Sequence, residues 1–125
     1  MRRKWYHIGM RIITTVVILI ALAGVFAGCL GLKGGKMKLP DNAVLLDVRQ
    51  ADEFNSGHIK GAVLVPHDMI AEKIGAVVPN KNTPLFVYCR SGRRSAIAVE
   101  AMEKLGYTNL TDLGGMDEAK KRLRK

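Results

Sequence analysis

The stretch Leu85-Phe86-Val87-Tyr88-Cys89-Arg90-Ser91-Gly92-Arg93-Arg94-Ser95 decides the fold expected of this 125-residue chain. Its first residues are apolar or aromatic, which predicts a buried strand, and the polar turn that follows contains a glycine. From Ser95 to Leu105 the apolar residues recur at helical spacing. A strand, a loop and a helix should therefore follow one another, with Cys89 where the strand ends.

Cys89 has the sequence surroundings of a reactive thiol. The first turn of a helix presents unpaired N–H groups and a partial positive charge, and both stabilise a nearby anion. A thiol with the usual pKa near 8.5 is only about 3% ionised at pH 7, and lowering that pKa by roughly two units takes about 2.7 kcal/mol. The loop amides and the guanidinium groups of Arg90, Arg93 and Arg94 can supply this stabilisation of the anion, so we expect Cys89 to be a nucleophilic thiolate. The alternative is a packed, inert thiol, because lone cysteines are often buried.

The rest of the chain alternates strand and helix patterns. A nearly continuous apolar run at residues 43–48 and a second apolar stretch at 62–65 predict two more buried strands, and Asn109-Leu110-Thr111-Asp112-Leu113 predicts the last strand. The intervening segments predict four helices: a short one from Asp52 to Ser56, one capped by Asp68, one from Ser95 to Leu105, and a basic one at 117–124 after Gly114-Gly115. This alternation predicts an α/β fold with a small parallel sheet flanked by helices on both faces. The functional loop should lie at the carboxyl end of a strand.

Three motifs in this order resemble those of rhodanese-like sulfurtransferases. Residues Cys89 to Ser95 resemble the active-site loop of that family, and Leu46-Asp47-Val48-Arg49 and Gly57-His58-Ile59-Lys60-Gly61-Ala62 resemble its other signatures. The resemblance covers about residues 43 to 116 and is strongest to the small exported single-domain rhodaneses of the phage-shock-protein E type. It implies a thiosulfate sulfurtransferase. Cys89 would take a sulfur atom from a small anionic donor, hold it as a persulfide, and pass it to a thiol or cyanide acceptor.

The resemblance also implies roles for single residues. The donor would be bound by the loop residues Arg90, Ser91, Gly92, Arg93, Arg94 and Ser95. Asp47 and Arg49 would support the site, with Arg49 paired to an acid such as Glu53, and His58 would hydrogen-bond structurally rather than act as a base. No cofactor and no metal are implied. Relatives often have one more strand and helix before the strand near Asp47, so we expect a reduced sheet.

Two other function classes stay open from the sequence. A cysteine in a loop of amides also suits an oxyanion enzyme, such as a phosphatase or an arsenate reductase. Phosphatase loops of the Cys-x5-Arg kind need an arginine six residues after the cysteine, and Ser95 stands there. The second alternative is a non-catalytic, membrane-tethered module that binds a persulfide or an anion.

The positive charge of the chain lies mainly at its N-terminus. Of 20 basic residues, seven lie in residues 1–38 without any acid, which leaves 13 basic and 11 acidic residues for the remainder. The nearly neutral remainder offers no extended basic face, so we expect no nucleic-acid partner. Cys29 and Cys89 are the two cysteines, and no structural disulfide is expected.

Residues 1–29 have the pattern of a signal peptide or a membrane anchor. Arg2, Arg3, Lys4 and Arg11 precede 21 uncharged residues, Ile12 to Leu32, which are long enough to cross a bilayer. Phe26-Ala27-Gly28-Cys29 resembles a lipobox, which makes Cys29 a lipidation candidate, and an uncleaved N-terminal hydrophobic helix is the alternative. Residues 30–38 read as a flexible basic tether and 39–125 as the domain. We expect the domain to be membrane-anchored on the extracytoplasmic, periplasmic side.

Overall fold

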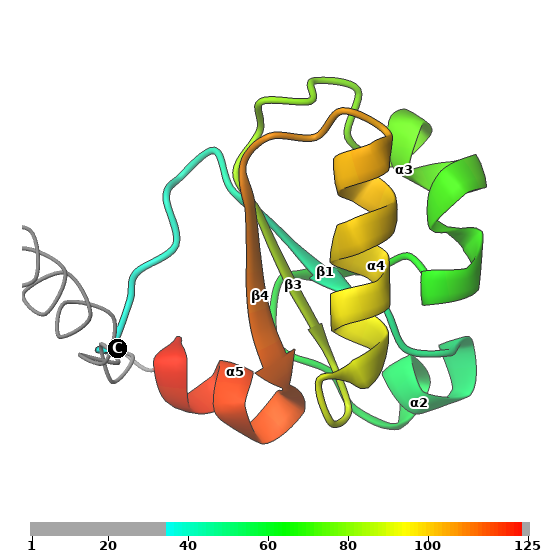
Figure 1. Ribbon diagram of the computed structural model, residues 1–125. Coiled ribbons are helices and arrows are strands. Elements are labelled where there is room, and N and C mark those ends of the chain that lie inside the picture. The colour runs from blue at the N-terminus through cyan, green and yellow to red at the C-terminus, as the bar shows by residue number, and fades with distance from the viewer. Residues whose placement is uncertain (1–34, 124–125) are drawn as a thin grey trace, which may run out of the picture. The chain divides into compact units, whose positions relative to one another are not determined.

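A four-stranded parallel sheet organises residues 35–123, the part of the chain that the computed structural model describes (Figure 1). Its strands lie in the order β2-β1-β3-β4. Their bounds are Val44–Asp47 for β1, Ala62–Leu64 for β2, Leu85–Cys89 for β3 and Leu110–Gly115 for β4. All three pairings are parallel, which confirms the α/β fold and the parallel sheet predicted from the alternating pattern.

Helices connect the strands and cover the sheet. They are α2 (Ala51–Ser56), the 3-10 turn η2 (His67–Met69), α3 (Ile70–Val77), α4 (Arg93–Lys104) and α5 (Met116–Arg122). Figure 1 shows α3 and α4 on one face of the sheet and the short α5 on the other. The predicted N-terminal hydrophobic helix, Cys29 and most of the tether lie outside the described residues. Within residues 35–123, no helix is long and apolar enough to span a bilayer.

The sheet separates two cores because successive side chains of a strand point to opposite faces. On the α3 and α4 side the larger core holds Leu46, Val87 and Cys89 against helix residues that include Met102. On the α5 side the smaller core holds Leu45, Tyr88, Leu113 and Ala119. Cys89 therefore points toward the helix that follows it, whereas Tyr88 points away from that helix.

The observed helices start one or two residues away from the predicted positions. Helix α2 starts at Ala51 rather than Asp52, and α5 starts at Met116 rather than Asp117. Helix α4 begins at Arg93 rather than Ser95, with Gly92 as N-cap in the left-handed region at φ 99°. The prediction that Asp68 caps the next helix is wrong, because Asp68 lies within η2, and Met69 precedes α3 with no side-chain cap. The Asp68 carboxylate instead accepts a hydrogen bond of 3.3 Å from the Gln50 side chain. The 3-10 turn thus moves the start of α3 beyond the reach of that carboxylate.

Candidate active site

Cys89 is the last residue of β3, and the loop that follows folds back over its sulfur. The residue is fully buried, and Sγ accepts a hydrogen bond of 3.0 Å from the backbone N–H of Gly92. Gly92 adopts a positive φ, which a glycine tolerates without steric cost. This turn ends the strand and directs the amides of the loop and of the first turn of α4 toward the sulfur.

The pKa of the Cys89 thiol is lowered from its ordinary value. Burial raises this pKa, because it removes water from the thiolate, but the hydrogen bonds around the sulfur outweigh the effect. They come from the amide and hydroxyl of Ser95 and from the amides of Gly92 and Ser91. The loop therefore supplies donors to an anion at this position, and the N-terminus of α4 adds its partial positive charge.

The three arginines of the loop have different environments. Arg94 forms an ion pair with Glu53 of α2, with 2.8 Å between Nη2 and Oε1. Arg90 and Arg93 are exposed, and within residues 35–123 neither has a carboxylate within ion-pair distance. Within the described residues, Arg90 and Arg93 therefore carry exposed charges without an ion-pair partner, whereas the charge of Arg94 is compensated by Glu53.

Arg49 pairs with Asp47 and not with Glu53, so the predicted partner was wrong. Its Nη2 lies 2.7 Å from Oδ2 of Asp47 and also donates to the carbonyl of Gly57 at 2.7 Å. The carboxylate of Glu53 instead pairs with Arg94. It also accepts a hydrogen bond from the backbone N–H of Gln50, the N-cap residue of α2. The side chain of Arg49 turns instead toward the buried end of its own strand.

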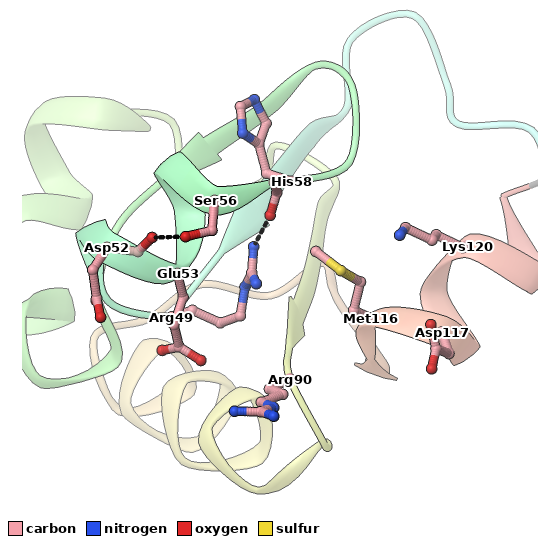
Figure 2. Close-up of a pocket in the computed structure, with 10 residues that line it drawn as sticks. Arg49, Asp52, Glu53, Ser56, His58, Arg90, Met116, Asp117 and Lys120 are labelled. Atoms are coloured by element: carbon pink, nitrogen blue, oxygen red, sulfur yellow. Dashed lines mark hydrogen bonds between the residues drawn. The ribbon is translucent and has the colours of Figure 1, made fainter.

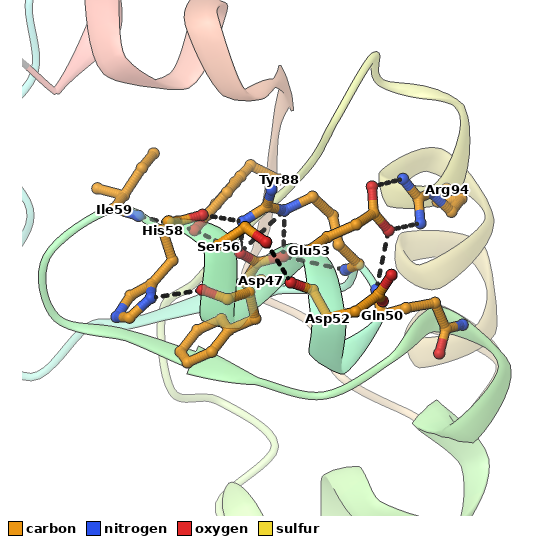
Figure 3. A network of polar contacts seen from close by, with 12 residues as sticks. Asp47, Gln50, Asp52, Glu53, Ser56, His58, Ile59, Tyr88 and Arg94 are labelled. Atoms are coloured by element: carbon orange, nitrogen blue, oxygen red, sulfur yellow. Dashed lines mark hydrogen bonds and ion pairs between the residues drawn. The ribbon is translucent and has the colours of Figure 1, made fainter.

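Asp47 is the centre of a buried polar network (Figure 3). It is fully buried and accepts hydrogen bonds from Arg49 and from the hydroxyl of Tyr88, the latter at 2.7 Å. The Tyr88 oxygen in turn accepts a bond of 3.0 Å from the N–H of Ile59. Burial raises the pKa of Tyr88, so its hydroxyl stays protonated and remains a donor. The network joins the ends of β1 and β3 to the turn around Gly57.

His58 lies in that turn and makes only local contacts. Its Nδ1 is 3.0 Å from the carbonyl oxygen of Phe54, and its ring stacks on the ring of Phe54 with centroids 3.7 Å apart. The residue is exposed and lies at the edge of an open cleft. These contacts fix the ring against α2.

The cleft of about 620 Å³ lies between α2, the active-site loop and the start of α5 (Figure 2). Positive and negative side chains share its walls: Arg90 and Lys120 on the one hand, Asp52 and Asp117 on the other. Within residues 35–123, no group of three His, Cys, Asp or Glu side chains is placed to hold a metal ion. The cleft therefore places charged side chains beside residues 90–92, the loop that follows Cys89, which we call the thiol loop.

The start of α5 braces the loop, a role that the sequence alone did not reveal. The N–H of Met116 donates to the carbonyl of Arg90 at 3.2 Å, and Gly115 forms a bridge with Ser91. A Cβ on Gly115 would lie 2.8 Å from that carbonyl oxygen. The second glycine of Gly114-Gly115 therefore permits a close backbone approach, which the sequence signalled only as a turn.

Comparisons with known proteins agree with this geometry. The family model described as "Rhodanese-like domain" matches residues 33–122. The thiosulfate sulfurtransferase PspE of Escherichia coli is 36% identical over 73 residues, covering 58% of this chain and 70% of PspE. YrkF of Bacillus subtilis is 30% identical over 78 residues, or 62% of this chain, but the match spans only 41% of YrkF.

A solved structure has the same fold. The structure titled "rhodanese with anions from E. coli" superposes with a TM-score of 0.59 at 34% identity. The match covers 61% of this chain and 89% of that one. The family match at residues 33–122 includes β3, the loop after Cys89 and α4.

Proposed function

Because the chain belongs to the family of rhodanese-like domains, we propose that it moves a sulfane sulfur from thiosulfate or a similar donor to a thiophilic acceptor. The intermediate is a persulfide on Cys89. One observation carries the proposal: a buried sulfur that accepts hydrogen bonds from loop amides and whose pKa is lowered against the effect of its own burial. A structural thiol needs no such donors.

The first half-reaction forms the persulfide. The Cys89 thiolate attacks the outer sulfur of thiosulfate, a new S–S bond forms, and the S–S bond of the donor breaks so that sulfite leaves with the electron pair. The negative charge then lies on the outer sulfur of Cys89. The amides that stabilise the thiolate can also stabilise this anion, because they point into the same loop.

The second half-reaction returns the enzyme to its thiolate form. An acceptor thiolate or cyanide attacks the outer sulfur, the persulfide bond breaks, and Cys89 keeps the electron pair of that bond. The charges of Arg90 and Arg93 favour the approach of anionic donors and acceptors. The cleft between α2 and α5 gives an acceptor room beside the loop.

Sulfur transfer fits the loop better than phosphate chemistry. The position six residues after Cys89 holds Ser95, which is buried. Its Oγ lies 2.9 Å from the carbonyl oxygen of Gly92, and its single hydroxyl proton can be directed either to that oxygen or to the Cys89 sulfur. Arg94 is one residue earlier and is paired with Glu53. The loop therefore offers no arginine in the place where a Cys-x5-Arg phosphatase uses one to bind phosphate.

We also propose that the domain acts outside the cytoplasm. The basic residues before the uncharged run Ile12 to Leu32 are typical of an export signal, with Cys29 as the lipidation site or the run as an uncleaved anchor. Both alternatives hold the domain at a membrane. Globomycin-sensitive processing of the chain in a bacterial host would distinguish a lipidated Cys29 from an uncleaved anchor.

Mass spectrometry of the purified full chain tests the chemistry. Treatment with thiosulfate should add about 32 Da to the peptide that contains Cys89, and a thiol reductant should remove it. Cyanide should then yield thiocyanate over many turnovers, whereas Cys89→Ser should give neither product. Hydrolysis of an aryl phosphate without any sulfur adduct would overturn the proposal, and one stoichiometric adduct without turnover would identify a binding module.

A further inference from the structure

A second hollow lies on the α5 side of the sheet, away from the thiol. It measures about 870 Å³, and its floor is apolar, with Leu39, Leu45 and Ile59 among the lining residues. Three lysines line it as well: Lys36 and Lys38 from the segment before β1, and Lys60 from the turn before β2. We call this hollow the lysine groove.

The lysine groove is uniformly positive. Its lining contains no acidic residue, and all three lysines are exposed. Within residues 35–123, none of their ammonium groups has a carboxylate within ion-pair distance. Three unpaired cations around an apolar floor suit a ligand with an anionic head and a hydrocarbon body.

The groove wall has a defined position relative to α5. The N–H of Met37 donates to the carbonyl of Arg122 at 2.7 Å, and Met37 and Leu39 pack against the smaller core. The segment that carries Lys36 and Lys38 is therefore held against the domain. Lys60 lies more than 20 residues further along the chain, yet it lines the same groove.

The position of the groove along the chain indicates what it binds, because the segment that carries Lys36 follows the proposed membrane anchor directly. Lys36 follows Leu32, the last residue of the uncharged run, by four residues, which span at most about 14 Å when fully extended. We propose that the lysine groove docks the domain on an anionic phospholipid bilayer, with the three ammonium groups on lipid phosphates. This inference rests on the proposed membrane anchor but is independent of the thiol chemistry.

Lysine footprinting of the full chain tests the docking. The chain is reconstituted in vesicles of phosphatidylcholine alone or of phosphatidylcholine with phosphatidylglycerol, and acylation of each lysine by a water-soluble reagent is followed by peptide mass spectrometry. In the anionic vesicles Lys60 should react about fivefold more slowly, the Boltzmann factor expected for one basic residue at such a surface. Lys73 serves as control, because it is exposed on α3, on the opposite side of the sheet.

Charge reversal separates the groove from the tether. Lys60→Glu should reduce the protection of Lys36 and Lys38 in anionic vesicles, whereas Lys73→Glu should leave it unchanged. Equal rates for Lys60 in both vesicles would overturn the proposal, and protection of Lys36 and Lys38 alone would assign the contact to the tether. A chain that does not associate with vesicles, or protection of Lys60 by soluble inorganic phosphate to the same degree, would also overturn it.

Discussion

The carboxylate of Glu53 accepts two hydrogen bonds from the guanidinium of Arg94, across 41 residues of sequence. Glu53 belongs to the short helix α2, and Arg94 belongs to the first turn of α4, directly behind the thiol loop. Both side chains are about three-quarters buried. The pair therefore ties one wall of the cleft to the helix whose N-terminus stabilises the Cys89 thiolate.

Glu53→Gln should destabilise the domain in a pH-dependent way. The Arg94 guanidinium holds the pKa of Glu53 at about 2, below its ordinary 4.5. Because the folded-state pKa is the lower one, the pair contributes stability above pH 4.5 and loses it as the pH falls toward 2. We expect a loss of about 1–2 kcal/mol in the free energy of unfolding at pH 7 after allowance for solvent screening. Urea unfolding of wild type and Glu53→Gln at several pH values measures this difference in the free energy of unfolding.

Asp52→Asn is the matched control for that experiment. It removes one negative charge from the same turn of α2, but the Asp52 side chain is exposed, and within residues 35–123 it is in no ion pair. Its effect should stay below about 0.5 kcal/mol. A difference between wild type and Glu53→Gln that does not change with pH would contradict the assignment.

The order of strands and helices and the position of the thiol could be predicted because they depend on local periodicity. Apolar runs and glycine turns determine where β3 ends, so the sequence pattern alone places Cys89 at the end of that strand. The partners of Arg49 and Arg94 could not be predicted, because three acids, Asp47, Asp52 and Glu53, lie within a few residues of Arg49. Which acid pairs with which arginine depends on how the thiol loop packs against α2.

Ser95→Ala should raise the pKa of the Cys89 thiol, because it removes a hydroxyl whose hydrogen bond to the sulfur favours the thiolate, and one such bond contributes about 1 kcal/mol. The hydroxyl and amide of Ser95 both lower that pKa, and the variant removes only the hydroxyl. The rate of iodoacetamide alkylation against pH, read by mass spectrometry of the Cys89 peptide, reports the shift. Ser91→Ala keeps the backbone amide and should leave the profile unchanged. Equal profiles for both variants would show that amides alone set the pKa.

Tyr88→Phe should cost about 2–3 kcal/mol of unfolding free energy, because it leaves the buried Asp47 carboxylate short of a donor and the Ile59 N–H without its acceptor. Tyr107→Phe is the control: its buried hydroxyl donates only to the carbonyl of Val78, so about 1 kcal/mol should be lost. Hydrogen exchange of the Ile59 amide should accelerate only in Tyr88→Phe. Unchanged exchange there would exclude the Tyr88 oxygen as the acceptor that holds the turn.

Gly115→Ala should slow persulfide formation by at least about tenfold, because small displacements of reacting groups reduce rates steeply. The added methyl would lie 2.8 Å from the carbonyl oxygen of Arg90 and 3.2 Å from the Cα of Ser91, so the thiol loop must move. Stopped-flow mixing with thiosulfate measures the rate, and circular dichroism establishes that the chain stays folded. Gly75→Ala is the control, since its Cβ would meet nothing within 4 Å and a helical alanine stabilises slightly. Equal rates in both variants would mean that the start of α5 does not position the loop.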